Sequence, residues 1–174
     1  MNRIKLKKLV ISALMAAIVC VATMVVQIPS PMQGYVNLGD CFVLLCGWFL
    51  GPVYGAAAAG IGSMLTDLFM GYAYYAPGTL IIKAVMALCA ALIYKAIKSN
   101  TAGFIISSVV SEIIMIAGYF GYAALLLGKG LAAAASIPGN IVQGLAGLII
   151  GTALALIIVK SGLDKKLFGK ENLN

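Results

Sequence analysis

Histidine is absent from the 174-residue sequence, and acidic residues are scarce, with five Asp and Glu against twelve Lys and Arg. The lack of histidine excludes catalytic triads, imidazole acid–base catalysis and the commonest zinc sites. The four cysteines form no CxxC pair, and no G-x-x-x-x-G-K-[ST] loop is present. We therefore expect no enzymatic activity, no ATPase site, and no metal or other cofactor.

Hydrophobic residues, by contrast, make up 63% of the chain and charged residues only 10%. Soluble domains usually carry about a quarter charged residues. Residues 9–28 and 131–159 contain no charge, and each run is long enough to cross a bilayer as a helix. The composition therefore predicts an all-α integral membrane protein that does not bind nucleic acid.

The predicted architecture is a single membrane domain over residues 1–174 with six helices. The predicted spans are about 9–28, 39–50, 53–70, 78–97, 103–127 and 134–159. Residues 41–64 carry no charge and could instead form one helix kinked at Pro52. Two helices joined at Gly51–Pro52 would require a short or partly re-entrant helix whose ends are buried in protein.

The distribution of basic residues favours six spans. With six, ten of the twelve Lys and Arg lie on one side, while Lys129 lies on the other and Lys83 lies within a span. With five, the split becomes five against six, which opposes the excess of positive charge found in cytoplasmic loops. We therefore expect a multi-pass protein of the cell membrane with both termini in the cytoplasm.

On this topology the polar groups of the membrane region concentrate in its outer half. They are Asn37, Asp40, Asp67, Lys83, Glu112, Tyr119, Asn140 and Gln143, below outer loops at 29–35 and 72–75. An ionisable group at bilayer depth costs about 2.5–3.5 kcal/mol and is functional by default. Structural explanations stay open: Asp40 could cap a helix, and Asp67 could pair with Lys83. Glu112 has no opposite charge in its own helix, which makes it the strongest candidate for a ligand contact, although it could pair with Lys83.

A tyrosine-rich pocket open to the outside, with amides and a few charges, suits a small, polar, aromatic solute. The apolar inner half argues against an ion channel. A binder without an energy source implies a partner protein. The alternatives are a stand-alone proton-coupled carrier that uses Asp67 and Glu112 as a relay, and a membrane scaffold without a ligand.

Four segments carry a resemblance to a known family: GYVNLGD (34–40), LGPVYG (50–55), GIGSMLTD (60–67) and YAPGTLIIK (75–83). In this order they resemble the S component, the substrate-binding subunit, of energy-coupling factor (ECF) vitamin transporters, and the resemblance covers essentially the whole chain. It implies capture of a vitamin at the outer face and association with a transmembrane coupling subunit and two ABC-type ATPases. The small-residue face of Ala13, Ala16 and Ala17 would meet that subunit. From pattern alone, internal packing explains this face equally well.

The resemblance also implies a binding site. The site would draw on Lys83, Glu112, Tyr119, Asn140 and Gln143, together with Asn37, Asp40, Asp67 and Tyr75 under the outer loops. A lysine, a carboxylate and amides suit a compact heteroaromatic with hydroxyl groups, so vitamin B6 or the hydroxymethylpyrimidine precursor of thiamin is the favoured substrate. Riboflavin, pantothenate and biotin are the alternatives.

Overall fold

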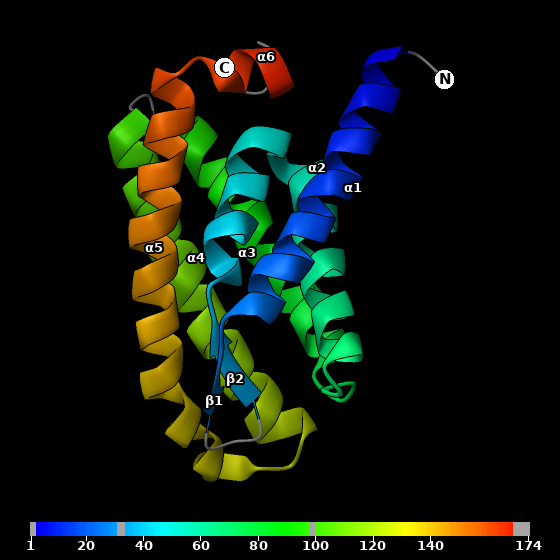
Figure 1. Cartoon of the computed structure of the whole chain (residues 1–174). Helices are drawn as coiled ribbons and strands as arrows, with labels where there is room; N and C mark the ends of the chain where they lie inside the picture. Colours follow the sequence, from blue (N-terminus) through cyan, green and yellow to red (C-terminus); the bar gives the residue numbers. More distant parts are fainter. Residues whose placement is uncertain (1–2, 31–33, 98–99, 169–174) are drawn as a thin grey trace.

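The computed structural model describes residues 3–30, 34–97 and 100–168, which form a bundle of long helices (Figure 1). The elements in chain order are α1 (Arg3–Val25), β1 (Gln27–Ser30), β2 (Gly34–Asn37), α2 (Gly39–Phe69), α3 (Ala76–Ala96), α4 (Asn100–Gly121), a π-helical turn η1 (Tyr122–Leu126), a 3-10 helix η2 (Gly130–Ser136), α5 (Ile137–Lys160) and α6 (Leu163–Phe168).

The long helix α2 is a hairpin of two helices. At Gly51 the backbone has φ 80° and ψ −179°, a conformation that is essentially restricted to glycine, and Pro52 follows. A Cβ added at Gly55 would lie 2.4 Å from the backbone oxygen of Cys46, so the two halves pack side by side. Figure 1 shows the chain reversing there. Five helical stretches are long and apolar enough to span a membrane, and the reversal within α2 makes six passes.

The first half of α2, residues 39–50, is by itself shorter than the hydrocarbon core of a bilayer. Twelve residues span about 18 Å, against a hydrocarbon core of about 30 Å. The antiparallel strands β1 and β2 lie next to its start, below it in the view of Figure 1, between α1 and α5. This arrangement matches the requirement that a re-entrant helix end be buried in protein.

The β-hairpin corrects two predictions. The first span was predicted to reach residue 28, but α1 ends at Val25, and the predicted loop at 29–35 belongs largely to the paired strands. Gln27 pairs with Asn37, and Ile28 pairs with Val36. The prolines and glycine of this segment suggest a loop, yet a two-stranded ribbon consists only of edges, where proline is tolerated. Residues 31–33 of the predicted loop lie outside the described residues.

Several helix ends also differ from the predicted spans. The span at 103–127 is α4 followed by the π turn η1, and the span at 134–159 is the end of η2 followed by α5. Gly128 and Gly130 both have positive φ and separate η1 from η2. A proline in the first turn fixes the start of α5, since its missing N–H has no helical partner there. The short helix α6 was not predicted.

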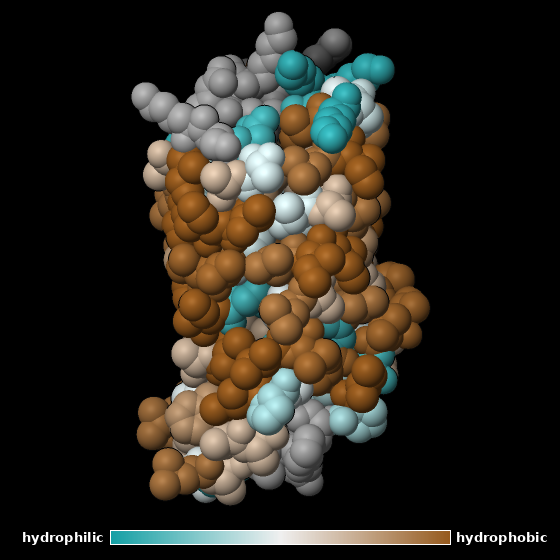
Figure 2. Space-filling model, turned by 90° about the vertical axis from the view of Figure 1, so that its left-hand side faces the viewer, coloured by the Kyte–Doolittle hydropathy of each residue, from teal (hydrophilic) through white to brown (hydrophobic). Residues whose placement is uncertain are grey.

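Both ends of the described chain lie at the same end of the bundle (Figure 1), as an even number of passes requires. Figure 2 shows hydrophilic residues gathered at that end and hydrophobic residues over most of the face below it. Lys98 and Lys170, which contribute to the charge argument, lie outside the described residues. By the positive-inside tendency the end that carries the termini is cytoplasmic, and the opposite end is external.

Candidate functional site

A cavity opens in the outer half of the bundle. Its empty space is about 580 Å³, counting the open space at its mouth. All the long helices contribute to its wall, together with β2 and the end of η2. The lining residues are Thr23, Tyr35, Asn37, Ser63, Asp67, Tyr75, Thr79, Lys83, Tyr119, Ser136, Asn140 and Gln143. A concave site with polar groups on several walls is the usual form of a small-molecule binding site.

A buried ion pair forms the base of the cavity. Lys83 on α3 donates a hydrogen bond to Asp40 in the first turn of α2, and the two side chains are 3% and 1% exposed. The interpretation that Asp67 pairs with Lys83 is therefore wrong, because Asp40 lies closer to the amine. The cap position of α2 is Leu38 and not Asp40, whose second oxygen instead accepts a hydrogen bond from Gln143 (2.7 Å). Pairing and the hydrogen bond from Gln143 offset part of the cost of burying two charges at bilayer depth.

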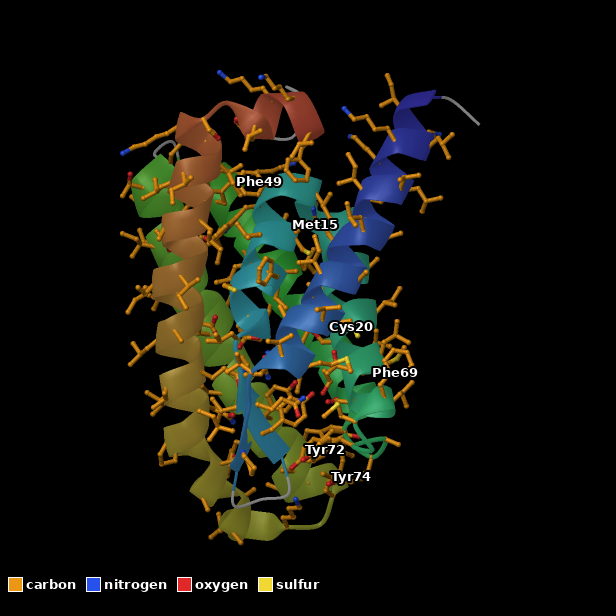
Figure 3. The ribbon with its side chains drawn as sticks, in the orientation of Figure 1. Met15, Cys20, Phe49, Phe69, Tyr72 and Tyr74 are labelled. Carbon is orange, nitrogen blue, oxygen red and sulfur yellow. The ribbon has the colours of Figure 1, made fainter. Side chains whose placement is uncertain are left out.

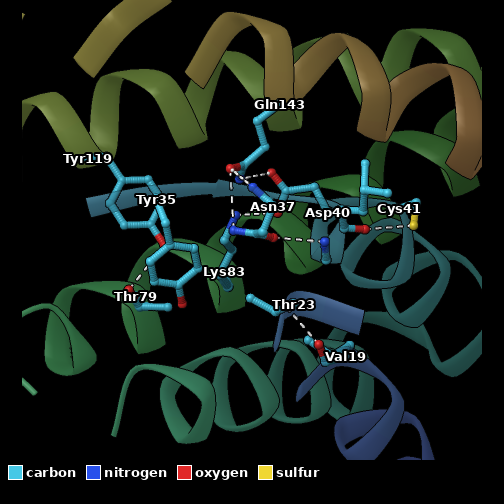
Figure 4. A network of polar contacts seen from close by, with 12 residues as sticks. Val19, Thr23, Tyr35, Asn37, Asp40, Cys41, Thr79, Lys83, Tyr119 and Gln143 are labelled. Atoms are coloured by element: carbon cyan, nitrogen blue, oxygen red, sulfur yellow. Dashed lines mark hydrogen bonds and ion pairs between the residues drawn. The ribbon is translucent and has the colours of Figure 1, made fainter. Parts of the chain in front are cut away.

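The β-hairpin holds this base in place. The Gln143 oxygen accepts hydrogen bonds from the Asn37 backbone N–H (2.9 Å) and from its side-chain amide (3.3 Å). The Asn37 side-chain oxygen in turn accepts the backbone N–H of Gly39 (2.8 Å), at the start of α2. Figure 4 shows Gln143 reaching from α5 to both Asn37 and Asp40. Both ends of the Gln143 amide are thus engaged by protein, which makes it a clamp between β2, α2 and α5.

Asp67 is the centre of a second polar group, on the far half of α2. The Tyr35 hydroxyl donates to its Oδ1 over 2.6 Å, and the Thr79 hydroxyl also interacts with the carboxylate. Tyr119 donates to Thr79 over 3.0 Å. Burial and the negative charge of Asp67 raise the pKa of Tyr35 well above its ordinary value, so this phenol stays protonated and remains a donor.

Tyrosines from the α2–α3 connection cover the outer end. The Tyr75 ring lies 6.3 Å from that of Tyr119 and 6.0 Å from that of Tyr122. Lys129 stands 5.3 Å above the Tyr75 ring and donates to its hydroxyl over 3.2 Å. Burial raises the pKa of Tyr75. Figure 3 shows Tyr72 and Tyr74 at this end, far from Phe49 near the termini. The aromatic cover thus lies on the external side of the cavity.

The structure brings most of the predicted site residues together. Seven of them line the cavity: Asn37, Asp67, Tyr75, Lys83, Tyr119, Asn140 and Gln143. Asp40 lies behind Lys83. Glu112, predicted as the strongest ligand contact, is not among the lining residues, because it faces Gly144 and Gly147 of α5 and the Asp40 carboxyl. Among the described residues, no hydrogen-bond partner lies within bonding geometry of its two buried oxygens.

Five lining residues were missed by the sequence reasoning: Thr23, Tyr35, Ser63, Thr79 and Ser136. A signal existed for three of them. The hydroxyls of Ser63, Thr79 and Ser136 each stand one turn before a predicted residue, at position i−4, and therefore share its helix face. Tyr35 shares a face of β2 with Asn37, but this strand was not predicted, so the relation was not visible in the sequence. Thr23 carries no comparable signal.

The predicted partner face divides into two parts. Ala13 and Ala17 of α1 are exposed. The backbone oxygen of Ala16 instead lies against Gly62 of α2, where an added Cβ would come within 2.4 Å of it. Ala16 therefore packs internally, while Ala13 and Ala17 face the surroundings of the bundle. Within the described ranges, no three acidic or cysteine side chains gather as a metal ion would require.

Comparisons with known proteins agree with this architecture. The family model of the ECF-type riboflavin transporter S component matches residues 3–160. The chain is 38% identical over 143 residues to an uncharacterized protein of Pyrococcus woesei, covering 82% of this chain and 95% of that protein.

A solved structure of the S component of a bacterial ECF transporter has the same fold, with a TM-score of 0.68 and 27% sequence identity. The match covers 90% of this chain and 98% of the solved one. Family, fold and the outer cavity agree, and they make this all-α, multi-pass chain of the cell membrane a member of the ECF-type riboflavin transporter S component family, the substrate-binding subunits of ECF transporters.

Proposed function

We propose that this subunit captures a flat, hydroxylated heteroaromatic vitamin from the external side. The observation that carries the proposal is the charge balance of the cavity. Lys83 is the only cation among the described lining residues, and Asp40 engages it. Because Asp40 offsets the charge of Lys83, the carboxylate of Asp67 is the charge that remains in the wall, where the other polar groups are hydroxyls and amides. Such a wall favours ligands that offer O–H or N–H donors and disfavours the free carboxylates of biotin and pantothenate.

Riboflavin is the leading candidate. The family model is that of riboflavin transporter S components, and the polar lining of the cavity suits a ligand with several hydrogen-bonding groups. A tricyclic flavin with its sugar-alcohol chain has this character. Vitamin B6 and hydroxymethylpyrimidine, which the sequence favours, form the second candidate class. Their hydroxyl groups and ring nitrogens match the same donors and acceptors.

The proposal includes partners. A chain that binds a solute at one end and packs tightly at the other requires an external source of energy to release it inward. We propose that a transmembrane coupling subunit with two ABC-type ATPases supplies that energy, and that it docks on the exposed face of Ala13 and Ala17 in the bilayer. In membranes, small residues allow helices to approach closely and thus favour association.

The test is small-molecule mass spectrometry, combined with the visible absorption spectrum, of detergent-purified full-length protein from cells grown in rich medium. We expect a stoichiometric vitamin, with a flavin spectrum if it is riboflavin. An empty protein would next be titrated with riboflavin, pyridoxine, hydroxymethylpyrimidine, biotin and pantothenate. Tight binding of biotin or pantothenate, or of none of the five, would overturn the proposed substrate class.

The same preparation separates this proposal from a proton-coupled carrier that uses Asp67 and Glu112. Liposomes containing only this chain should bind the vitamin without accumulating it when a pH gradient is imposed. Accumulation that depends on the gradient and is lost in Glu112→Gln would establish the carrier instead.

A further inference from the structure

Two polar side chains in the cavity wall have hydrogen-bonding capacity that the described protein does not use. They are Ser63, whose Oγ has no partner, and Asp67, whose Oδ2 has none. Each side chain belongs to a residue that is 3% exposed. Buried polar atoms are almost always paired in native proteins, so two unpaired atoms in one wall call for an explanation.

These two atoms share one face of one helix. Ser63 and Asp67 are four residues apart on the second half of α2, and side chains at this spacing are neighbours on a helix surface. The other buried unpaired side chains of the described chain, such as Thr152 and Glu112, do not line the cavity. The fully buried, unpaired side-chain atoms of the described cavity wall are therefore concentrated on Ser63 and Asp67.

The contacts of Asp67 define which ligand groups this part of the cavity wall can bind. The 2.6 Å bond from Tyr35 to Oδ1 has the length of a charge-assisted bond to an ionised carboxylate. An ionised carboxylate accepts hydrogen bonds only, whereas a serine hydroxyl both donates and accepts. Because Tyr35 and Thr79 already approach the carboxylate, its orientation is fixed, and Oδ2 is left for a donor that comes from the cavity.

We propose that Ser63 and Asp67 determine specificity by forming hydrogen bonds with the polar edge of the bound heterocycle. The edge presents an N–H or O–H donor to Asp67 Oδ2 and an adjacent acceptor or hydroxyl to Ser63. Cyclic imides, lactams, aminopyrimidines and hydroxypyridines carry such an edge, and carboxylates do not. This inference rests on the proposed function and names the part of the substrate that the site recognises.

The experiment uses detergent-purified full-length protein and isothermal titration with two matched pairs of probes. The pairs are riboflavin with 3-methylriboflavin, and pyridoxine with 3-O-methylpyridoxine, where the methyl group removes the edge donor. The variants are Asp67→Asn, Ser63→Ala and the control Thr152→Val. The control removes another buried, unpaired hydroxyl that lies outside the cavity.

For the probe that binds, Asp67→Asn should weaken affinity about 10- to 100-fold, and Ser63→Ala about 3- to 10-fold. Thr152→Val should change it less than about twofold. Methylation of the probe should weaken binding to the wild type about tenfold or more and add little to the loss in Asp67→Asn, because both remove the same bond.

The outcomes separate the two proposals. Wild-type affinity in both Asp67→Asn and Ser63→Ala would overturn the proposed role of these two residues in specificity, while leaving the proposal of vitamin capture intact. Full affinity of the wild type for the methylated probe would also overturn it, and this measurement does not depend on the folding of any variant. If neither riboflavin nor pyridoxine binds the wild type, the proposed substrate class fails, and the inference fails with it.

Discussion

The outer and inner halves of this bundle use the same helices in opposite ways. The outer half holds an open cavity whose wall contains one acidic side chain, one basic side chain and two buried polar atoms without partners. The inner half is filled by large aromatic side chains: the Trp48 and Phe104 rings lie 4.7 Å apart, and Tyr94 stacks on Phe104 at 4.6 Å. Trp48 and Phe49 are each 1% exposed.

This difference shows that rigid packing and solute binding are located at opposite ends of the bundle. Packing at the density of a protein interior gives the inner half rigidity but leaves no room for a solute. The outer half keeps unpaired polar groups, which lowers stability and creates affinity. A chain built in this way binds at one end and is closed at the other, which is why the proposed mechanism requires a partner.

The boundary between the two halves is the buried ion pair, and breaking it should have the largest effect. Lys83→Met leaves the Asp40 carboxylate buried without its cation, which costs about 3–5 kcal/mol of stability. Thermal unfolding in detergent should show a large fall in Tm. The double variant Asp40→Asn/Lys83→Met, which buries no charge, should recover most of the loss. A Lys83→Met protein that melts like the wild type would contradict the role of the pair.

The tight turn of α2 should give the next largest effect. A Cβ at Gly55 would lie 2.4 Å from the Cys46 backbone oxygen, so Gly55→Ala forces the two inner half-helices apart. Overpacking of this kind costs about 3 kcal/mol at the upper end of its range. Gly121→Ala is the matched control, because no atom lies within 4 Å of an added Cβ there and alanine favours helix. Equal melting of the two variants would argue against close packing at Gly55.

The same turn shows how far sequence reasoning reaches. Residues 41–64 carry no charge, so hydropathy alone cannot distinguish one kinked helix from two short ones. The positions of Lys95 and the C-terminal lysines favour two, and the backbone at Gly51 agrees. The distribution of Lys and Arg between the two sides depends on the number of passes and not on the exact helix ends. The number of passes could therefore be predicted from it.

Pairing between helices could not be predicted in this way. The sequence suggests Asp67 or Glu112 as the partner of Lys83, whereas the structure pairs it with Asp40, because the choice depends on how the helices are rotated against each other. The strands β1 and β2 escaped prediction because their proline and glycine content is typical of loops. Ser63 and Thr79 were accessible to the i−4 rule, since each precedes a predicted residue by one turn.

A smaller effect is expected where an inner polar group is paired. The Trp48 indole N–H donates to Ser107 Oγ over 2.9 Å inside the aromatic cluster. Ser107→Ala leaves that buried donor without an acceptor and should cost about 1–2 kcal/mol of stability, with vitamin affinity unchanged. The control Ser108→Ala removes only a bond to the Phe104 backbone oxygen and should cost less. Loss of vitamin affinity in Ser107→Ala would show that the two halves are not independent.

We expect the smallest effect on stability at the exposed face of α1, which does not pack against the rest of the bundle. Ala17 is exposed on α1, so Ala17→Trp should leave Tm and vitamin affinity unchanged within about 0.5 kcal/mol. Uptake in cells that contain the coupling module should nevertheless fall strongly, because an indole at this position keeps another helix from approaching. Ile149→Trp, on an exposed position of α5, is the control and should leave uptake intact. If Ala17→Trp abolishes vitamin binding in the isolated chain, the face supports the cavity and the partner docks elsewhere. If both variants take up vitamin normally, α1 is not the contact with the coupling subunit, and that subunit must bind another surface of the bundle.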